Sequence, residues 1–199
     1  MLVILSLVDP YSFGHSNIFS NKGFILIVFV STFFIPALSV LMMKALDMVE
    51  SIQLRDRQER IGPYIITGIF YLWLFINLRQ NPNVPESFKV CLLGATIGLF
   101  LAFLINLFSK ISMHTTGMGG LLAMSVITVF NFSKTTFWLP LPSGDAIEFS
   151  SQMIIFFALI VAGLVGTSRL LLKAHEPQDI YGGYLVGMLA QFAAFAILI

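Results

Sequence analysis

Charged residues are scarce in this chain. Its 199 residues include 11 Lys and Arg and 10 Asp and Glu, so 11% are charged, while 57% are hydrophobic and the mean hydropathy is +0.91. Soluble domains carry about 25% charged and about 45–50% apolar residues. The composition excludes an ordinary soluble domain and predicts an integral membrane protein. The net charge of +1 gives no indication of a nucleic-acid partner.

Cysteine is nearly absent as well. Cys91 lies inside an apolar run and is the only cysteine, so no disulfide can form within the chain and cysteine says nothing about the compartment. Residues 1–8 are apolar but too short to span a bilayer, and they have no basic segment and no small-residue cleavage site. We therefore expect no cleavable signal peptide, and insertion through the first spanning helix.

Six apolar segments are long enough for transmembrane helices, which need about 20 mostly apolar residues. Pro36 lies in the first and predicts a kink. The expected fold class is an all-α, six-helix transmembrane bundle, with residues 1–23 as an N-terminal segment and 24–199 as one membrane domain. The expected spans are 24–46, 63–78, 88–107, 117–132, 153–172 and 180–199.

Six spans place the connections after the first, third and fifth on one side of the membrane. Both chain ends and the 79–87 and 133–151 loops then lie on the other side. The first side receives seven Lys and Arg residues and the second receives four, a bias that the positive-inside rule alone could explain. The seven are Lys44, Arg55, Arg57, Arg60, Lys110, Arg169 and Lys173, and the four are Lys22, Arg79, Lys89 and Lys134.

Glycines recur at short spacings within the spans, where they let helix backbones approach closely in lipid. We expect them to serve helix packing and not phosphate loops. The pairs are Gly94 and Gly98, Gly163 and Gly166, and Gly183 and Gly187.

Polar residues gather in SRLLLKAHEPQD, residues 168–179, where a helix should re-enter the membrane. Pro177 suits the first turn of a helix, and a carboxylate at Asp179 is favoured there by the helix dipole. Four residues apart, Asp179 can hold one ring nitrogen of His175 and leave the other free. This is the base-and-orienter half of a nucleophile arrangement. Ser168 and Arg169 would add donors for an oxyanion, since the planar arginine fork suits phosphate.

This segment resembles the third signature of the type 2 phosphatidic acid phosphatase (PAP2) superfamily: Ser-Arg, five residues, His, three residues, Asp. All four fixed places match. The second signature, Pro-Ser-Gly-His, is similar to ISMH at 111–114, where Ser112 and His114 match while Ile111 and Met113 depart. PSGD at 142–145 is closer by letters, but it would lie on the opposite side of the membrane, lacks the histidine and is interpreted as a turn.

The first signature, Lys, six residues, Arg-Pro, is the weakest match. Arg55 stands where the lysine would be, and Gly62, before Pro63, stands where the arginine would be. Arg60 or Arg57 would then have to reach the same phosphate from another turn. Over residues 24–199 the chain resembles a bacterial membrane-bound branch with relaxed first and second signatures.

The resemblance implies a six-helix fold of PAP2 type and a phosphatase that needs no metal and no cofactor. His175 would attack phosphorus and form a phosphohistidine, Asp179 would orient it, and His114 would protonate the leaving alcohol. The implied phosphate ligands are Arg55, Arg60, Ser112, Ser168 and Arg169.

The implied substrates are lipid phosphates or polyprenyl pyrophosphates. The implied location is the bacterial inner membrane, with the site facing the periplasm. Contacts with membrane lipids are expected, partner membrane proteins or a homo-oligomer stay open, and nucleic acid is not expected.

Alternatives remain at the level of sequence. The His175–Asp179 pair could be a helix cap, His114 a loop histidine, and residues 55–60 a solvated helix end. The chain could be a non-catalytic PAP2-like subunit that acts as a scaffold or partner in a larger assembly. A transporter is less favoured, because the polar residues lie at span ends and not at mid-span.

Overall fold

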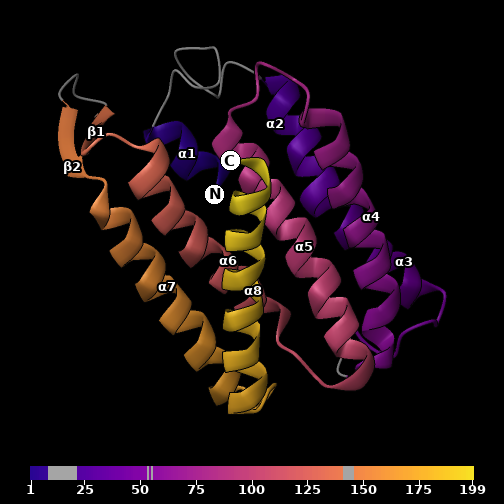
Figure 1. Cartoon of the computed structure of the whole chain (residues 1–199). Helices are drawn as coiled ribbons and strands as arrows, with labels where there is room; N and C mark the ends of the chain where they lie inside the picture. Colours follow the sequence, from indigo (N-terminus) through magenta and orange to yellow (C-terminus); the bar gives the residue numbers. More distant parts are fainter. Residues whose placement is uncertain (9–21, 53, 55, 141–145) are drawn as a thin grey trace.

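The computed structural model describes residues 1–8, 22–52, 54, 56–140 and 146–199. In this part of the chain the elements are helices with one short β-hairpin (Figure 1). In chain order they are α1 (Leu2–Val8), α2 (Lys22–Phe29), the π-helical turn η3 (Val30–Phe34), α3 (Ile35–Ala45), the 3-10 turn η4 (Gln58–Arg60), α4 (Ile61–Leu78), α5 (Glu86–Phe108), α6 (Met113–Ile127), the π-helical turn η5 (Thr128–Phe132), β1 (Thr136–Pro140), β2 (Ala146–Ser150), α7 (Gln152–Leu171) and α8 (Pro177–Leu198).

Within the described residues, six helical segments are long and apolar enough to cross a membrane, as the sequence predicts. Each overlaps one expected span and differs from it at the ends by a few residues, most at the starts of the second and fourth. The chain is an integral membrane protein with an all-α bundle. The segments are Lys22–Ala45, Gln58–Leu78, Glu86–Phe108, Met113–Phe132, Gln152–Leu171 and Pro177–Leu198.

The first of these segments is not a regular α-helix. The π-helical turn η3 lies directly before Pro36, which occupies the first turn of α3. Proline has no backbone N–H and clashes with the preceding turn, and a π-helical turn is one way in which a helix absorbs that disturbance. The irregularity expected at Pro36 is therefore present as this turn.

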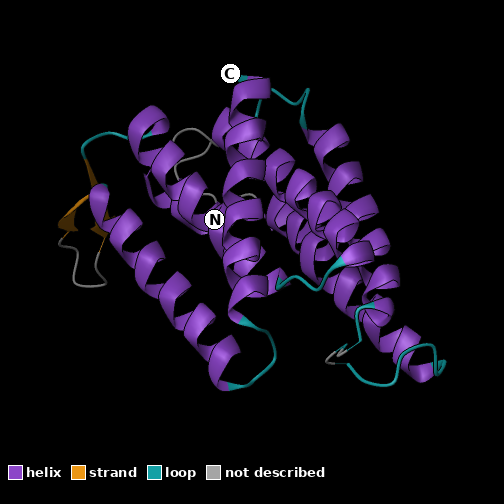
Figure 2. Cartoon of the chain, turned by 60° about the horizontal axis from the view of Figure 1, so that its bottom comes forward, coloured by secondary structure: helices purple, strands orange, loops and turns teal. Residues whose placement is uncertain are grey.

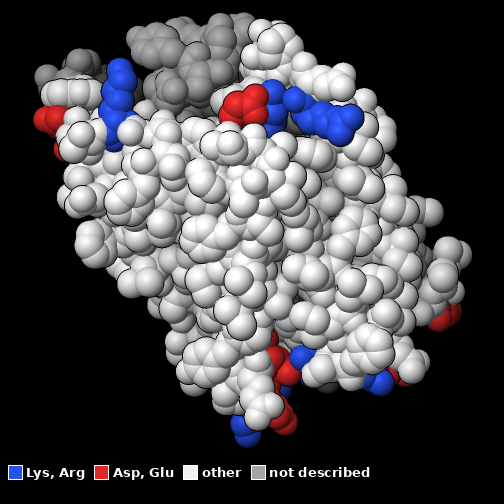
Figure 3. Space-filling view, in the orientation of Figure 1, with Lys and Arg blue, Asp and Glu red and all other residues white. Residues whose placement is uncertain are grey.

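The charged residues mark the two ends of the bundle. Figure 3 shows Lys, Arg, Asp and Glu at the top and bottom of the molecule, with a broad uncharged belt between them. The α3–α4, α5–α6 and α7–α8 connections lie together at the bottom, and Figure 2 turns this end toward the viewer. The C-terminus, the α4–α5 connection and the β-hairpin lie at the top (Figure 1). The predicted grouping of connections is therefore confirmed.

The hairpin was not predicted. Strands β1 and β2 pair antiparallel between the fourth and fifth spans, from Thr136 opposite Ser150 to Pro140 opposite Ala146. The PSGD segment interpreted as a turn falls among residues 141–145, outside the described residues.

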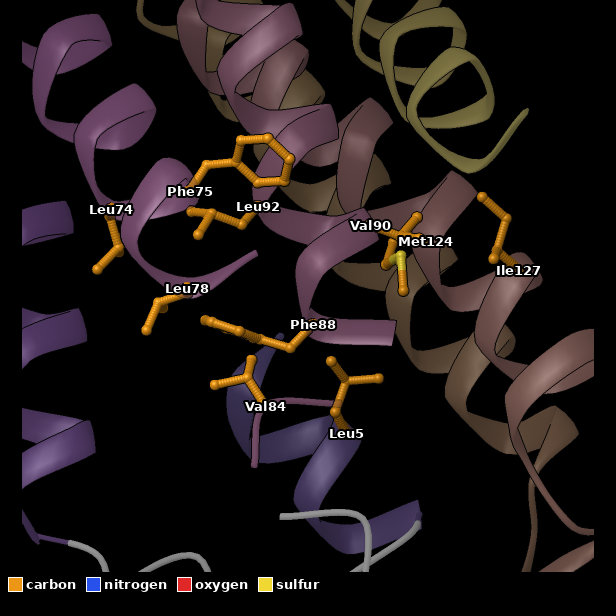
Figure 4. Close-up of a cluster of buried hydrophobic side chains, with 10 residues drawn as sticks. All are labelled: Leu5, Leu74, Phe75, Leu78, Val84, Phe88, Val90, Leu92, Met124 and Ile127. Carbon is orange, nitrogen blue, oxygen red and sulfur yellow. The ribbon is translucent and has the colours of Figure 1, made fainter. Parts of the chain in front are cut away.

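A hydrophobic cluster holds the upper part of the bundle together (Figure 4). Leu5 of α1 lies in this cluster beside residues of α4, α5 and α6, including Leu74, Phe88 and Met124. Helix α1 thus packs onto the membrane bundle, although it is too short to span it.

Helices α6 and α8 approach most closely through glycines. A Cβ atom at Gly187 would collide with the backbone oxygen of Thr116, and one at Gly183 would lie 2.8 Å from the backbone oxygen of Ser112. Contacts this short leave no room for a side chain, so these positions require glycine. A Cβ atom at Gly163 would meet nothing within 4 Å outside its own helix backbone, so this glycine shows no such packing role.

Candidate active site

A cavity of about 760 Å³ lies at the end of the bundle where the three connections meet. This volume is within the usual range for small-molecule sites. Its described lining contains four basic side chains and two histidines, and no Asp or Glu. The lining residues are Ile52, Leu54, Arg60, Lys110, Met113, His114, Arg169, Leu172, Lys173, Ala174 and His175.

His175 is held by Asp179, as the sequence predicts. Its Nδ1 lies 3.2 Å from Oδ2 of Asp179, and the two side chains are only 5% and 13% exposed. The same carboxylate oxygen accepts a hydrogen bond from the backbone N–H of Glu176, which completes a capping box at the start of α8. Asp179 therefore caps the helix and orients the ring at once, so the two interpretations of this pair are compatible. Because Nδ1 faces Asp179, Nε2 of His175 is the ring nitrogen left for chemistry.

His114 reaches the same cavity from the first turn of α6. Its position relative to His175 is fixed by main chain: the backbone N–H of Ser112 donates to the backbone oxygen of Asp179 at 3.3 Å. The glycine contacts between α6 and α8 lie one and two turns farther along α8. The two histidines, 61 positions apart in sequence, are thus carried by a closely joined pair of helix ends.

Arg60 enters the cavity from the start of α4. It is 8% exposed, and its Nε and Nη1 donate to the backbone oxygens of Leu54 (2.8 Å) and Ile111 (3.2 Å). Gly62, the residue at the arginine place of the first signature, packs instead beside Met43. Arg60 is therefore the α4 arginine that faces the cavity. Arg57 does not line it and donates to the backbone oxygen of Phe108 at 2.8 Å.

Arg169 lines the cavity from the last turn of α7. Its Nε is buried and has no hydrogen-bond partner among the described residues. Leaving a buried donor on a charged group unsatisfied is costly, so an anion in the cavity would meet an unused donor.

Two of the predicted phosphate ligands, Ser112 and Ser168, are not among the described residues that line the cavity. Ser168 gives its hydroxyl to the backbone oxygen of Val165 at 2.7 Å. Ser112 is fully buried, and its Oγ has no partner within the described part of the chain. Arg55 lies outside the described residues. Their phosphate-binding roles stay predictions.

The pKa of His175 is lowered from its ordinary value of 6.5, chiefly by burial. The positive charges of Arg60 and Lys110 lower it further, whereas the hydrogen bond and charge of Asp179 raise it. The net direction keeps the ring neutral at lower pH, and a neutral ring is the form that can act as a nucleophile.

Comparison with known families agrees with this geometry. The family model of the PAP2 superfamily matches residues 106–198, which run from the end of α5 to the end of α8 and include both histidines. Over these residues the chain is similar to the PAP2 superfamily. The match does not include α4, so the contribution of Arg60 comes from outside it. Searches among curated proteins and among solved structures gave no match.

Two lysines of this cavity were not predicted from the sequence. Lys110 precedes the ISMH segment and Lys173 lies inside the third signature, and both line the cavity. In the sequence both lysines contribute only to the charge bias between the two sides. Their position beside the motifs was the signal that could have identified them. Among the residues that the structure describes, no three His, Cys, Asp or Glu side chains gather closely enough to hold a metal ion.

Proposed function

We propose that the chain is a phosphatase that hydrolyses lipid phosphates or polyprenyl pyrophosphates through a phosphohistidine intermediate. The observation that carries the proposal is the meeting, in one cavity, of a carboxylate-held His175, a second histidine from another helix, and the arginines Arg60 and Arg169. The match of residues 106–198 to the PAP2 superfamily supports it.

The geometry suits in-line displacement at phosphorus. Nε2 of His175 attacks, a bond from nitrogen to phosphorus forms, and the bond from phosphorus to the leaving oxygen breaks. His114 gives its proton to that oxygen and then takes one from the water that releases orthophosphate from His175. Arg60 and Arg169 would neutralise the phosphoryl oxygens, and such positioning and charge stabilisation supply most of the catalysis in phosphoryl transfer.

The position of the cavity fits a lipid substrate. It lies at one end of the six spans, next to the uncharged belt of the bundle. A phosphorylated headgroup would bind there while its chain remains among the helices. We propose that this end faces the periplasm of a bacterial inner membrane, and that the substrate comes from the surrounding bilayer.

The test is release of phosphate by the purified full chain in detergent. The panel is phosphatidic acid, phosphatidylglycerol phosphate and undecaprenyl pyrophosphate, with EDTA present. We expect release from at least one substrate, complete loss in His175→Ala, and normal release in Lys134→Ala, which changes an exposed residue at the opposite end. Acid-labile labelling of the wild type, absent from His175→Ala, would identify the phosphohistidine.

No release from any substrate by folded protein would refute the proposal. It would favour the non-catalytic subunit, for which the specific observation is the glycine at position 62 with Met43 packed against it. Arg60 favours catalysis. It places in the cavity the guanidinium group that the first signature would otherwise supply from position 62.

A further inference from the structure

The cavity contains more positive charge than the residues assigned to one phosphoryl group provide. Beyond Arg60 and Arg169, its lining includes Lys110 and Lys173, neither of which belongs to the fixed places of the signatures. No carboxylate among the described lining residues offsets these four charges. A phosphate monoester carries a charge of about −1.5 to −2 at neutral pH, so the set exceeds what one phosphoryl group requires.

The two lysines line the same cavity as the predicted nucleophile, His175. Lys110 lies in the α5–α6 connection. Lys173 comes from the α7–α8 connection. Both residues are exposed, whereas Arg60 is buried. The cavity therefore has arginine in its depth and lysine at its rim.

The backbone at Lys173 is unusual for a lysine. The residue has φ 49°, in the left-handed region. It ends α7 in a Schellman arrangement, with its own N–H on the Leu170 oxygen (2.9 Å) and that of Ala174 on the Arg169 oxygen (3.1 Å). Glycine is the usual residue at this place, because a Cβ atom is disfavoured there. A lysine kept in a strained position beside the cavity points to a function for its side chain.

Resting on the phosphatase proposed above, we propose that Lys110 and Lys173 form a subsite for a second phosphate group, so that the preferred substrate is a diphosphate ester of a lipid alcohol. The terminal phosphate lies against Arg60, Arg169 and His175, and the phosphate next to the alcohol lies at the lysine rim. Nε2 of His175 bonds to the terminal phosphorus, the bond from that phosphorus to the bridging oxygen breaks, and His114 protonates the leaving lipid monophosphate. Water then frees orthophosphate from the histidine and returns a proton to His114.

The alternative is that the lysines contact the headgroups of surrounding anionic lipids, as basic residues at a membrane edge often do. Charge alone does not separate these cases. The left-handed lysine and the shared cavity favour the substrate, because lipid attraction requires neither.

The experiment compares farnesyl diphosphate with farnesyl monophosphate, which share one alcohol. The variants are Lys110→Ala and Lys173→Gly, with Lys134→Ala as a control that removes the same charge at the other end. Lys173→Gly suits the left-handed backbone, so it removes the ammonium group without straining the turn. We expect the wild type to prefer the diphosphate, and each lysine variant to lose about tenfold in kcat/KM for the diphosphate, as expected for one charged contact. The loss with the monophosphate should be several times smaller, and Lys134→Ala should leave the ratio unchanged.

Equal losses on both substrates would overturn the inference and leave the phosphatase intact. An unchanged ratio combined with weaker binding to vesicles containing phosphatidylglycerol would overturn it too, in favour of lipid contact. If wild type hydrolyses neither farnesyl substrate, the phosphatase proposal is judged by the substrate panel above, and the subsite is judged by calorimetric binding of inorganic pyrophosphate against orthophosphate. Tighter pyrophosphate binding that both lysine variants abolish would support the subsite, and equal binding would overturn it.

Discussion

Replacing Asp179 by Asn separates the two tasks of this side chain. An asparagine oxygen can still accept the hydrogen bond from the backbone N–H of Glu176 (3.3 Å), so the start of α8 keeps a cap. What the variant loses is the negative charge 3.2 Å from Nδ1 of His175. That charge matters most when the ring bonds to phosphorus and becomes positive.

The expected loss of kcat in Asp179→Asn follows from the distance between the two side chains and from their burial. Two unit charges about 4 Å apart at an effective dielectric of about 20 interact by about 4 kcal/mol. The Asp179 side chain is 13% exposed and the ring charge is only partly developed in the transition state, so the loss should be about half of this ceiling. About 2 kcal/mol corresponds to a fall of about 30-fold in kcat.

The assay is initial-rate phosphate release on the best substrate of the panel, with Glu176→Gln as the control. Glu176 is the exposed neighbour that caps the same helix, so its variant removes an equal charge from the same turn without touching the ring. We expect Glu176→Gln to lose less than about threefold, since exposed charges contribute little. A fall of less than about threefold in Asp179→Asn, or equal falls in both variants, would refute the orienting role of Asp179.

Four further outcomes are expected. Gly187→Leu should prevent the close approach of α8 to the Thr116 backbone and lower the Tm sharply or abolish folding. Gly163→Leu, whose Cβ atom would meet nothing within 4 Å, should leave the Tm nearly unchanged. Arg60→Lys cannot donate to two separate carbonyls in the same way, so kcat/KM should fall about 10-fold to 100-fold with little loss of expression. Lys173→Gly should raise the Tm, because relief of the left-handed backbone contributes about 1 kcal/mol. The lowered pKa of His175 should keep the acid limb of the kcat/KM profile below pH 6.5, and an acid limb above pH 6.5 would contradict this. The neutral ring should also contribute folding stability that is present above pH 6.5 and lost as the pH falls.

The spans and the membrane side of the motifs were predictable because they depend on local, additive properties. Twenty apolar residues span a bilayer wherever they occur, and alternation then assigns each connection to a side. The contact of His175 with Asp179 was predictable for the same reason, since residues four apart share a helix face. All of these rest on short stretches of sequence.

What could not be predicted depends on contacts between distant segments. Nothing in the sequence around Arg60 says that its guanidinium will bond to the backbone of Leu54 and Ile111 and so face the cavity. Leu5 likewise joins a cluster whose other members come from α4, α5, α6 and the α4–α5 connection. The burial of Ser112 is of this kind as well: its place in the motif suggested a phosphate ligand, but the packing of α6 on α8 encloses it.

The main-chain contact between α6 and α8 has a consequence for how this protein tolerates change. Because Gly183 and Gly187 lie directly on the backbone of α6, the separation of His114 from His175 is set by main-chain atoms and not by the sizes of intervening side chains. The lipid-facing side chains can therefore diverge widely between relatives without altering the spacing of the two histidines. Sequence comparison would then find nearly invariant positions along one face of α6 and one face of α8, surrounded by variable positions.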